Sequence, residues 1–304
     1  MTANIIDGIK LANQVRSEVS EGVQALKASH DVTPGLAVIL VGDDPASTVY
    51  VRNKQRAATE AGMIAKDIKL PAGTTRDELA TTIDDLAGDD NIHGMLVQMP
   101  LPEHLDPVSA IDKLPASKDV DGLTATNSGL LVGGRPRFIP ATPAGIQQML
   151  VRSGYDPKGK HVVVCGRSDI VGKPVSLLLI QKQLGADATV TICHSQTRDI
   201  ETITRQADIL IAAIGRPNFI GPDMVKKGAI VIDVGVNRIK APERKSGYKL
   251  VGDVDFDGVS EKAEAITPVP GGVGPMTIAM LLKNTLEAAK FWVSQKYPHN
   301  NSIG

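Results

Sequence analysis

Tyr50 and Lys54 are four positions apart in a segment whose spacing of apolar residues predicts a helix over residues 47–61. Side chains four residues apart lie on one helical face, so the phenol can hydrogen-bond the amine. An amine held in this way is suited to accept or deliver a proton. The alternative is a surface lysine whose stem lies along the protein while its charge stays in water.

Two further polar side chains lie at the end of a predicted strand and in a predicted turn. Gln98 follows an apolar strand at its C-terminal end in GMLVQMPLP, residues 94–102, and ligands of open parallel sheets bind at the carboxyl ends of strands. Asp121 lies in the tight acidic turn Lys118–Gly122, where its carboxylate can accept two parallel hydrogen bonds from a planar amino-heterocycle such as a pterin. A solvent-exposed Asp-Gly turn is the alternative interpretation of the second segment.

The segment TPVPGGVGPMT, residues 267–277, contains three prolines and three glycines. Glycines allow the backbone to approach a planar ligand, and prolines stiffen the loop. A turn-rich linker is the alternative, but the length and density of the segment favour a ligand-binding loop.

A second kind of site is indicated where the apolar run 161–165 enters Gly166, Arg167 and Ser168 before a predicted helix near Val171. A helix N-terminus offers free amides and a partial positive charge to a pyrophosphate. Ser168 stands where the dinucleotide-binding pattern has its second glycine, so the motif by itself is weak. Plain packing of the strand against the helix is the alternative.

The end of the next predicted strand favours NADP over NAD. NAD-binding folds usually carry a carboxylate there, whereas this chain has Cys193-His194-Ser195-Gln196-Thr197-Arg198. Arg167, Ser195 and Arg198 are suited to bind a 2′-phosphate. The alternative is that Ser195 caps a helix and Arg198 is a solvated residue of its first turn. His194 is interpreted as a loop histidine rather than a catalytic one.

Length and composition limit the classes of protein. A chain of 304 residues is expected to form two domains. With 33 basic and 34 acidic residues, it lacks the bulk positive charge that nucleic-acid or anionic-membrane binding uses. Cys165 and Cys193 end apolar runs, which indicates buried thiols and no metal site. No leader or membrane-spanning segment is recognised, so we expect a cytoplasmic protein.

Alternating apolar runs and helical patterns predict an α/β fold with two domains. The expected organisation is an N-terminal open α/β domain and a C-terminal Rossmann-like, doubly wound parallel sheet, with a cleft between them. The tetrad Thr75-Arg76-Asp77-Glu78 predicts a capping box. The predicted boundaries are residues 1–140, completed by a C-terminal helix over 276–304, and residues 141–275. A polar loop or hairpin is expected at 241–249.

Several longer segments together resemble the bifunctional methylenetetrahydrofolate dehydrogenase/cyclohydrolase family. They occur in order from about Asp7 to Thr285: Tyr50-x-x-x-Lys54, VQMPLP, KDVDG, GRSDIVGKP, CHSQT, VIDVGVNR, GDVDF and TPVPGGVGPMT. The resemblance implies that residues 1–140 bind folate, that residues 141–275 bind NADP, and that the chain forms a homodimer.

The resemblance also implies roles for individual residues. The implied catalytic residues are Lys54, Tyr50 and Gln98. The implied substrate contacts are Tyr50, Gln98, Asp121, Pro270 and Gly271. The implied NADP contacts are Gly166, Arg167, Ser168, Ser195, Val236 and Thr277, with no metal.

The reaction implied by this resemblance is NADP-dependent oxidation of 5,10-methylenetetrahydrofolate, followed by hydrolysis of the methenyl product to 10-formyltetrahydrofolate. Because the methenyl group is cationic, Lys54 is most useful when it is uncharged and can accept a proton from the attacking water. A shikimate- or amino-acid-dehydrogenase-like NADP oxidoreductase is the alternative enzyme. A sensor that binds folate and nucleotide without catalysis is the alternative from another class.

Overall fold

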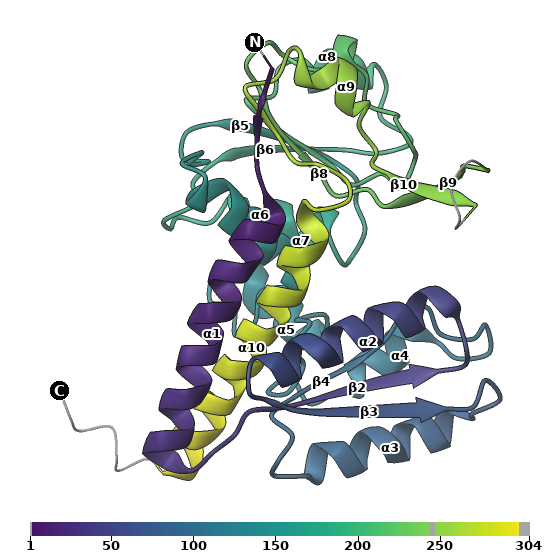
Figure 1. The fold of residues 1–304 in the computed structure, drawn as a ribbon, viewed down its shortest axis with the longest axis vertical. Helices are drawn as coiled ribbons and strands as arrows, with labels where there is room; N and C mark the ends of the chain where they lie inside the picture. Colours follow the sequence, from purple (N-terminus) through teal and green to yellow (C-terminus); the bar gives the residue numbers. More distant parts are fainter. Residues whose placement is uncertain (1, 243–246, 298–304) are drawn as a thin grey trace. The chain divides into compact units, whose positions relative to one another are not determined.

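The computed structural model describes residues 2–242 and 247–297 (Figure 1). The chain divides into two compact units. One, the six-stranded unit, contains Met1–Ala12 and Thr142–Thr277. The other, the three-stranded unit, contains Asn13–Ala141 and Ile278–Gly304. Each unit has its own parallel sheet, which confirms the predicted α/β fold class.

The three-stranded unit is built on a parallel sheet with strand order β3-β2-β4. Its strands are β2 (Gly35–Val41), β3 (Ile64–Leu70) and β4 (Gly94–Val97). Its helices are α2 (Pro45–Glu60), α3 (Arg76–Gly88), α4 (Pro107–Asp112), α5 (Ala125–Val132) and most of α1 (Gly8–His30) and α10 (Val273–Lys296). Figure 1 shows α2 and α3 on opposite faces of this sheet.

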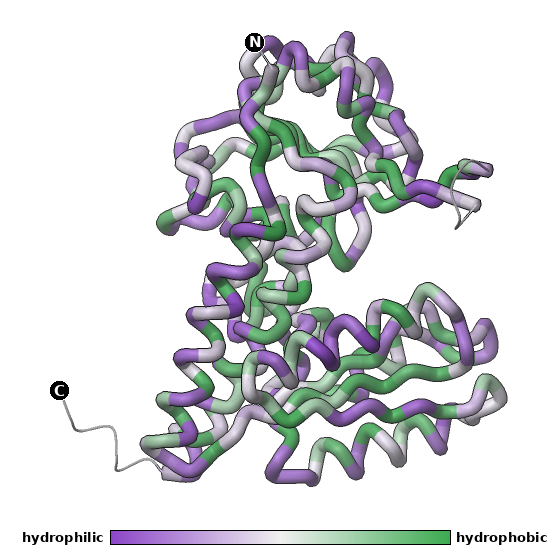
Figure 2. The backbone as a smooth tube through the Cα atoms, viewed as in Figure 1, coloured by the Kyte–Doolittle hydropathy of each residue, from purple (hydrophilic) through white to green (hydrophobic). Residues whose placement is uncertain are grey.

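Burial in this sheet follows the position of each strand. Every residue of central β2 is buried, whereas edge strand β3 alternates between partly buried and exposed residues. Figure 2 shows the same contrast as a hydrophobic β2 beside a mixed β3. One face of β2 and β4 packs on Leu79, Ile83 and Leu86 of α3. The order β3-β2-β4 puts the point where the winding reverses between β2 and β4.

Capping residues determine where two of these helices begin. Asp44 caps α2, because its Oδ2 accepts the Ser47 N–H at 2.7 Å and Pro45 occupies the first turn. The capping box predicted at Thr75 is confirmed, since Glu78 and Thr75 bond each other's backbone N–H. The Pro-rich segment before Pro107 forms neither helix nor strand, but Pro107 itself begins α4 after the cap Asp106.

The six-stranded unit contains an all-parallel sheet with order β1-β11-β8-β7-β5-β6. Its strands are β1 (Asn4–Ile5), β5 (His161–Cys165), β6 (Thr189–Cys193), β7 (Ile209–Ala212), β8 (Ile230–Asp233) and β11 (Ala265–Ile266). Its helices are α6 (Ala141–Arg152), α7 (Gly172–Leu179), α8 (Ile200–Thr204), η1 (Pro222–Met224) and α9 (Phe256–Ser260). The winding reverses between β5 and β7, which makes the carboxyl ends of these strands the expected ligand site.

Three details differ from the sequence-based expectation. Met1–Ala12 belongs to the six-stranded unit rather than with residues 13–140, because β1 pairs with β11. A doubly wound parallel sheet is expected to bury its strands on both faces, but β6 is an edge strand with mostly exposed or partly buried residues. The predicted helix 276–304 corresponds to α10, Val273–Lys296, and residues 298–304 lie outside the described residues.

The described residues of the polar segment 241–249 lie at an antiparallel hairpin. Strand β9 (Asn237–Lys240) pairs with β10 (Tyr248–Val251), and residues 243–246 lie outside the described residues. Within the described ranges, no helix combines the length and the apolar character that crossing a membrane requires.

Candidate functional site

Lys54 and Gln98 form the centre of the candidate site in the three-stranded unit. Lys54 Nζ donates a hydrogen bond to Gln98 Oε1 at 3.0 Å. Gln98 Nε2 donates to the carbonyl of Met99 at 2.8 Å, which turns the amide oxygen toward Lys54. Gln98 directly follows β4, and Lys54 lies on α2, the helix after β2. The pair therefore lies where the winding of the sheet reverses.

The Asp121 carboxyl interacts electrostatically with Lys54. Burial raises the pKa of the Asp121 carboxyl, the positive charge of Lys54 opposes this, and the neighbouring Asp119 adds to the rise. Tyr50 lies one helical turn before Lys54 on α2 and is 47% exposed, so its ring is available to a ligand. The structure thus brings Lys54 and Gln98 into contact, puts Asp121 within range of the charge of Lys54, and leaves Tyr50 exposed one turn before Lys54.

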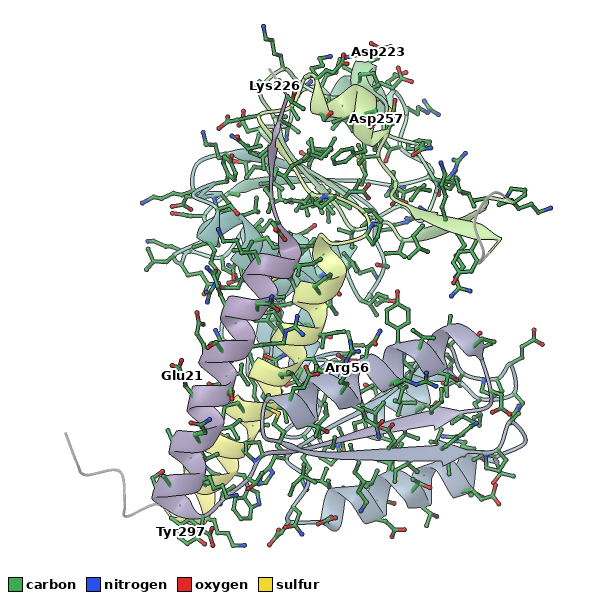
Figure 3. All side chains as sticks on the ribbon, in the orientation of Figure 1. Glu21, Arg56, Asp223, Lys226, Asp257 and Tyr297 are labelled. Carbon is green, nitrogen blue, oxygen red and sulfur yellow. The ribbon has the colours of Figure 1, made fainter. Side chains whose placement is uncertain are left out.

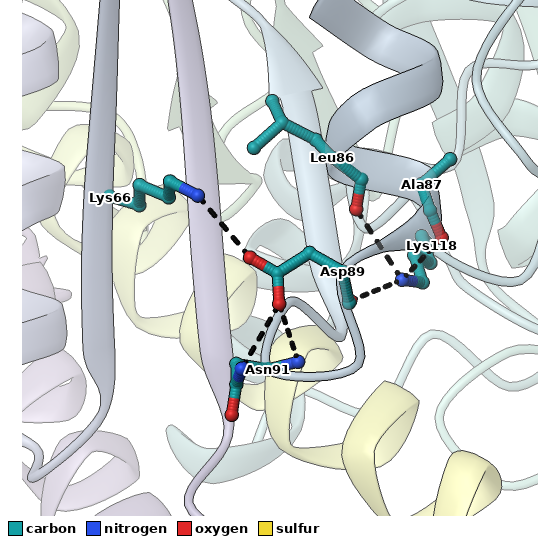
Figure 4. A network of polar contacts seen from close by, with 6 residues as sticks. All are labelled: Lys66, Leu86, Ala87, Asp89, Asn91 and Lys118. Carbon is teal, nitrogen blue, oxygen red and sulfur yellow. Dashed lines mark hydrogen bonds and ion pairs between the residues drawn. The ribbon is translucent and has the colours of Figure 1, made fainter.

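Lys118 anchors the segment that carries Asp121, a role that the sequence analysis missed. Its Nζ donates to the carbonyls of Leu86, Ala87 and Asp89, at 3.5, 2.8 and 2.9 Å (Figure 4). These carbonyls end α3, where helical hydrogen bonding leaves carbonyls without intrahelical partners. Burial lowers the pKa of Lys118. A lysine next to an acidic turn was the only signal, and the sequence does not say which helix end it reaches.

Asp119 holds the same segment from the other side. Its Oδ2 accepts the Thr124 N–H and the Asn127 side-chain amide, both at 2.8 Å, and the residue is completely buried. Thr124 in turn caps α5. Asp119 is therefore committed to local structure, which leaves Asp121 as the carboxylate of this turn that can bind a ligand.

The turn Gly166-Arg167-Ser168 follows β5 in the six-stranded unit. Gly166 has φ +142°, and a Cβ there would lie 2.2 Å from the carbonyl oxygen of Ala213, so no side chain fits. Ser168 Oγ accepts the N–H groups of Val171 at 3.2 Å and Gly172 at 3.4 Å. Ser168, which replaces the second glycine of the usual pattern, thus helps to cap α7, while Arg167 is exposed.

Ser195 lies just beyond the end of β6, the neighbour of β5. The pairing of Cys165 with Cys193 puts the ends of these strands side by side, so Arg167 and Ser195 emerge from adjacent strands. Both are exposed, as is Arg198. Ser195 does not cap α8, whose N-cap is Asp199, so the simple capping alternative is not supported.

His194 takes part in the local turn. Its Nδ1 accepts the N–H of Gln196 at 3.2 Å, and its own N–H donates to Thr197 Oγ1 at 2.9 Å. This agrees with the interpretation of His194 as a loop histidine. Cys165 and Cys193 are both buried and free, as predicted.

The remaining predicted site residues also lie in the six-stranded unit. Val236 follows β8 and is 49% exposed. Thr277 shares a hydroxyl hydrogen bond with Thr142 at 2.9 Å. Pro270 is exposed, and Gly271 has φ +107°, a conformation that favours glycine. Pro270 and Gly271, predicted to contact folate, therefore belong to a different unit from Tyr50, Gln98 and Asp121.

Two family models match the chain. The model described as "Tetrahydrofolate dehydrogenase/cyclohydrolase, catalytic domain" matches residues 6–121. The model described as "Tetrahydrofolate dehydrogenase/cyclohydrolase, NAD(P)-binding domain" matches residues 140–293. The second description assigns NAD(P) binding to the part of the chain that contains the six-stranded sheet.

Curated proteins and solved structures agree with these matches. The chain is 56% identical to "Bifunctional protein FolD" of Moorella thermoacetica, over 95% of this chain and 100% of that protein. A crystal structure of a Campylobacter jejuni methylenetetrahydrofolate dehydrogenase/cyclohydrolase is 45% identical, with TM-score 0.89, covering 95% of this chain and 99% of that one. The Trypanosoma brucei enzyme complexed with NADP and inhibitor is 41% identical, with TM-score 0.91, covering 96% and 99%.

Proposed function

The chain belongs to the tetrahydrofolate dehydrogenase/cyclohydrolase family, and on this premise we propose that it oxidises 5,10-methylenetetrahydrofolate with NADP and hydrolyses the methenyl product to 10-formyltetrahydrofolate. The observation that carries the proposal is the Lys54–Gln98 hydrogen bond beside Asp121, within a unit that matches the family's catalytic domain. The three-stranded unit supplies the proposed folate-binding residues, and the six-stranded unit the NADP-binding residues.

Lys54 is the proposed base of the hydrolytic step. With Lys54 uncharged, water adds to the cationic methenyl carbon and Lys54 accepts one proton from that water, which leaves a neutral hydroxyl adduct. One carbon–nitrogen bond of this adduct then breaks, the hydroxyl becomes the formyl carbonyl, and the hydroxyl proton goes to the released nitrogen. Gln98 Oε1 supports this role, because it holds the Lys54 nitrogen in one position. Asp121 is the proposed partner of the pterin edge, and the Tyr50 ring the neighbour of the folate.

The residues of the six-stranded unit fit a dinucleotide. Gly166 packs against Ala213 without room for a side chain, and the N-terminus of α7, where a phosphate would find backbone N–H groups, follows directly. Gly166, Arg167 and Ser168 are the proposed phosphate contacts, Ser195 the 2′-phosphate contact, and Val236 and Thr277 the nicotinamide contacts. When bound, NADP supplies the hydride acceptor. The absence of a carboxylate at the end of β6 supports NADP over NAD.

Three further proposals follow from the resemblance and the composition. We propose a homodimer formed through the six-stranded units, a cytoplasmic location, and a supply of formyl groups to purine biosynthesis. The near balance of 33 basic and 34 acidic residues supports small-molecule substrates rather than nucleic acid or membranes as partners. Sedimentation of the purified chain tests the dimer.

A spectrophotometric assay tests the central proposal. Protein mixed with NADP and methylenetetrahydrofolate is expected to produce NADPH, followed by loss of the methenyl absorbance. NAD is expected to react more slowly. Reduction of NADP with shikimate or amino acids, and none with methylenetetrahydrofolate, contradicts the proposal and favours the alternative dehydrogenase.

A further inference from the structure

Two buried carboxylates at the carboxyl edge of the six-stranded sheet have no role in the site described above. Asp233 ends β8 and is 3% exposed, and Asp253 follows β10 and is 0% exposed. An ionised carboxylate in the interior is costly unless N–H groups satisfy it. The hydrogen-bond donors of Asp233 and Asp253 therefore show which segments these carboxylates hold together.

Asp253 joins the segments that follow two neighbouring strands. Its Oδ2 accepts the N–H groups of Ile214 at 2.6 Å and Gly215 at 2.9 Å, just beyond the end of β7. Its Oδ1 accepts the side-chain amide of Asn237 at 2.8 Å, just beyond the end of β8. A single carboxylate thus sets the spacing of the two segments.

Asp233 in turn holds the backbone of Asp253. Asp233 Oδ1 accepts the N–H groups of Asp253 and Gly235, both at 2.9 Å. Asp233 Oδ2 accepts the N–H of Val254 at 3.0 Å. The Asp253 carboxylate is therefore held in two ways. Asp233 fixes the backbone that carries it, and three donors bind its oxygens.

Two glycines leave room for these carboxylates. A Cβ at Gly235 would lie 2.2 Å from Asp253 Oδ1, and one at Gly252 would lie 1.7 Å from Asp233 Oδ2. Both distances are far shorter than any van der Waals contact, so each carboxylate occupies the space of a side chain. The close approach of backbone and carboxylate depends on glycine at both positions.

The segments that Asp253 joins lie next to predicted cofactor contacts. Ala213, which immediately precedes Ile214, is the residue against which Gly166 packs without room for a Cβ. Val236 lies between the two residues, Gly235 and Asn237, that the carboxylates hold. A shift of the Asp253 carboxylate would therefore displace Ala213, against which the Gly166 turn packs, and also Val236.

We infer that Asp253 is a positioning residue for the dinucleotide: its carboxylate holds the ends of β7 and β8 at the spacing that the Gly166 turn and Val236 require. The inference rests on the proposed NADP site. The affected ligand is a nicotinamide dinucleotide, and the effect acts through backbone placement rather than through contact with the ligand. Hydrolysis of methenyltetrahydrofolate, which needs no dinucleotide, is independent of it.

Titration of the full-length protein with NADP tests the inference. Asp253→Asn offers one acceptor oxygen instead of two, so one of the two segments faces an NH₂ group. We expect its Kd for NADP to rise about tenfold or more, equivalent to about 1.4 kcal/mol. The kcat and KM for methenyl hydrolysis without NADP are expected to stay within twofold. NADP binding within twofold of the wild type overturns the inference.

Asp257→Asn is the matched control, because Asp257 is an exposed carboxylate four residues further along the same segment (Figure 3). It is expected to bind NADP as the wild type does. A wild type that binds no NADP refutes the proposed function instead, which separates the two failures.

Two variants of Asn237 extend the test, and the first of them serves by itself if Asp253→Asn does not fold. Asn237→Ala removes one donor from Asp253 at a partly buried position, and we expect about a threefold to tenfold rise in the Kd for NADP. The exchange Asp253→Asn with Asn237→Asp restores an amide–carboxylate pair of reversed polarity and is expected to bind NADP more tightly than Asp253→Asn. An unchanged Kd in Asn237→Ala contradicts the inference.

Discussion

The side-chain nitrogen of Lys54 lies 3.0 Å from the amide oxygen of Gln98, although 44 positions separate the two residues in the chain. The contact exists because β2 and β4 are neighbouring strands. Helix α2, which carries Lys54, follows β2, and Gln98 follows β4. The first two predictions concern this pair.

Lys54→Met is expected to lower kcat for methenyl hydrolysis by about 10²–10⁴-fold, the usual contribution of a general base. The Kd for NADP is expected to stay within twofold, because the predicted NADP contacts lie in the six-stranded unit. Arg56→Met is the control, since Arg56 is an exposed cation on the same helix (Figure 3). Arg56 pairs only with Glu60 at the surface among the ion pairs of the described residues. Unchanged hydrolysis in Lys54→Met refutes the assignment of Lys54.

Gln98→Leu is expected to reduce hydrolysis about tenfold while leaving the Kd for NADP unchanged. The variant keeps a side chain of similar size but removes the oxygen that holds Lys54, so the amine samples more orientations. Steady-state hydrolysis and the thermal midpoint are to be measured together. A fall in the midpoint that accounts for the whole loss of activity would show a structural role instead.

Lys118→Met is expected to lower the free energy of unfolding by about 2 kcal/mol, because three backbone carbonyls lose a charged donor in a partly buried place. The KM for folate is also expected to rise, since the anchored turn carries Asp121. Lys66→Met is the control: Lys66 pairs with Asp89 in the same network at the surface (Figure 4), and its loss is expected to cost about 0.5 kcal/mol. Equal losses in urea unfolding contradict this prediction.

Asp233→Asn is expected to change how stability depends on pH. Burial raises the pKa of the Asp233 carboxyl from 3.8 to about 6, although hydrogen bonds from Asp253, Val254 and Gly235 lower it. The folded protein therefore keeps this proton at pH values where the unfolded chain has released it. The stabilisation is fully present below about pH 4 and is lost as pH rises through about 6, a change of about 3 kcal/mol.

The asparagine variant lacks this titration. The unfolding free energy of the wild type minus that of the variant is therefore expected to fall as pH rises from 4 to 6. Urea unfolding at several pH values measures the difference. A difference that stays constant or grows contradicts the raised pKa of Asp233.

Ser195→Asp is expected to raise the Kd for NADP at least about tenfold and to leave the Kd for NAD almost unchanged. The added carboxylate would face the proposed 2′-phosphate beside Arg167, and like charges repel at short range. Gln183→Asp, at an exposed position, carries the same change of charge and is expected to have no effect. Equal losses for NADP and NAD contradict the proposed 2′-phosphate contact.

Much of the fold could be predicted because the signals are local. The helix predicted over residues 47–61 matches α2, Pro45–Glu60, to within two residues, and the predicted capping box at Thr75 is present, since both depend on residues within a few positions. The apolar run 161–165 forms β5, and the helix predicted near Val171 is α7, which begins at Gly172. The alternation of strands and helices was sufficient to predict two parallel sheets.

Long-range pairing could not be predicted in the same way. Strand β1 has two residues, too few to show a pattern, and it belongs to the six-stranded sheet only through β11, about 260 positions later. The exposure of β6 follows from its place at the edge of the sheet, which its apolar residues do not reveal. Pairing of this kind depends on the free energy of the whole sheet rather than of one segment.

The sequence by itself determined the family and the class of chemistry. It also predicted the side chains for that chemistry: an amine, an amide and a carboxylate in one half, and a glycine turn without a following acid in the other. The tertiary structure decided which of them meet and what holds them. The sequence does not say which helix end Lys118 binds, or which N–H groups Asp233 and Asp253 bind. These partners are set by packing across distant segments and not by neighbours in the chain.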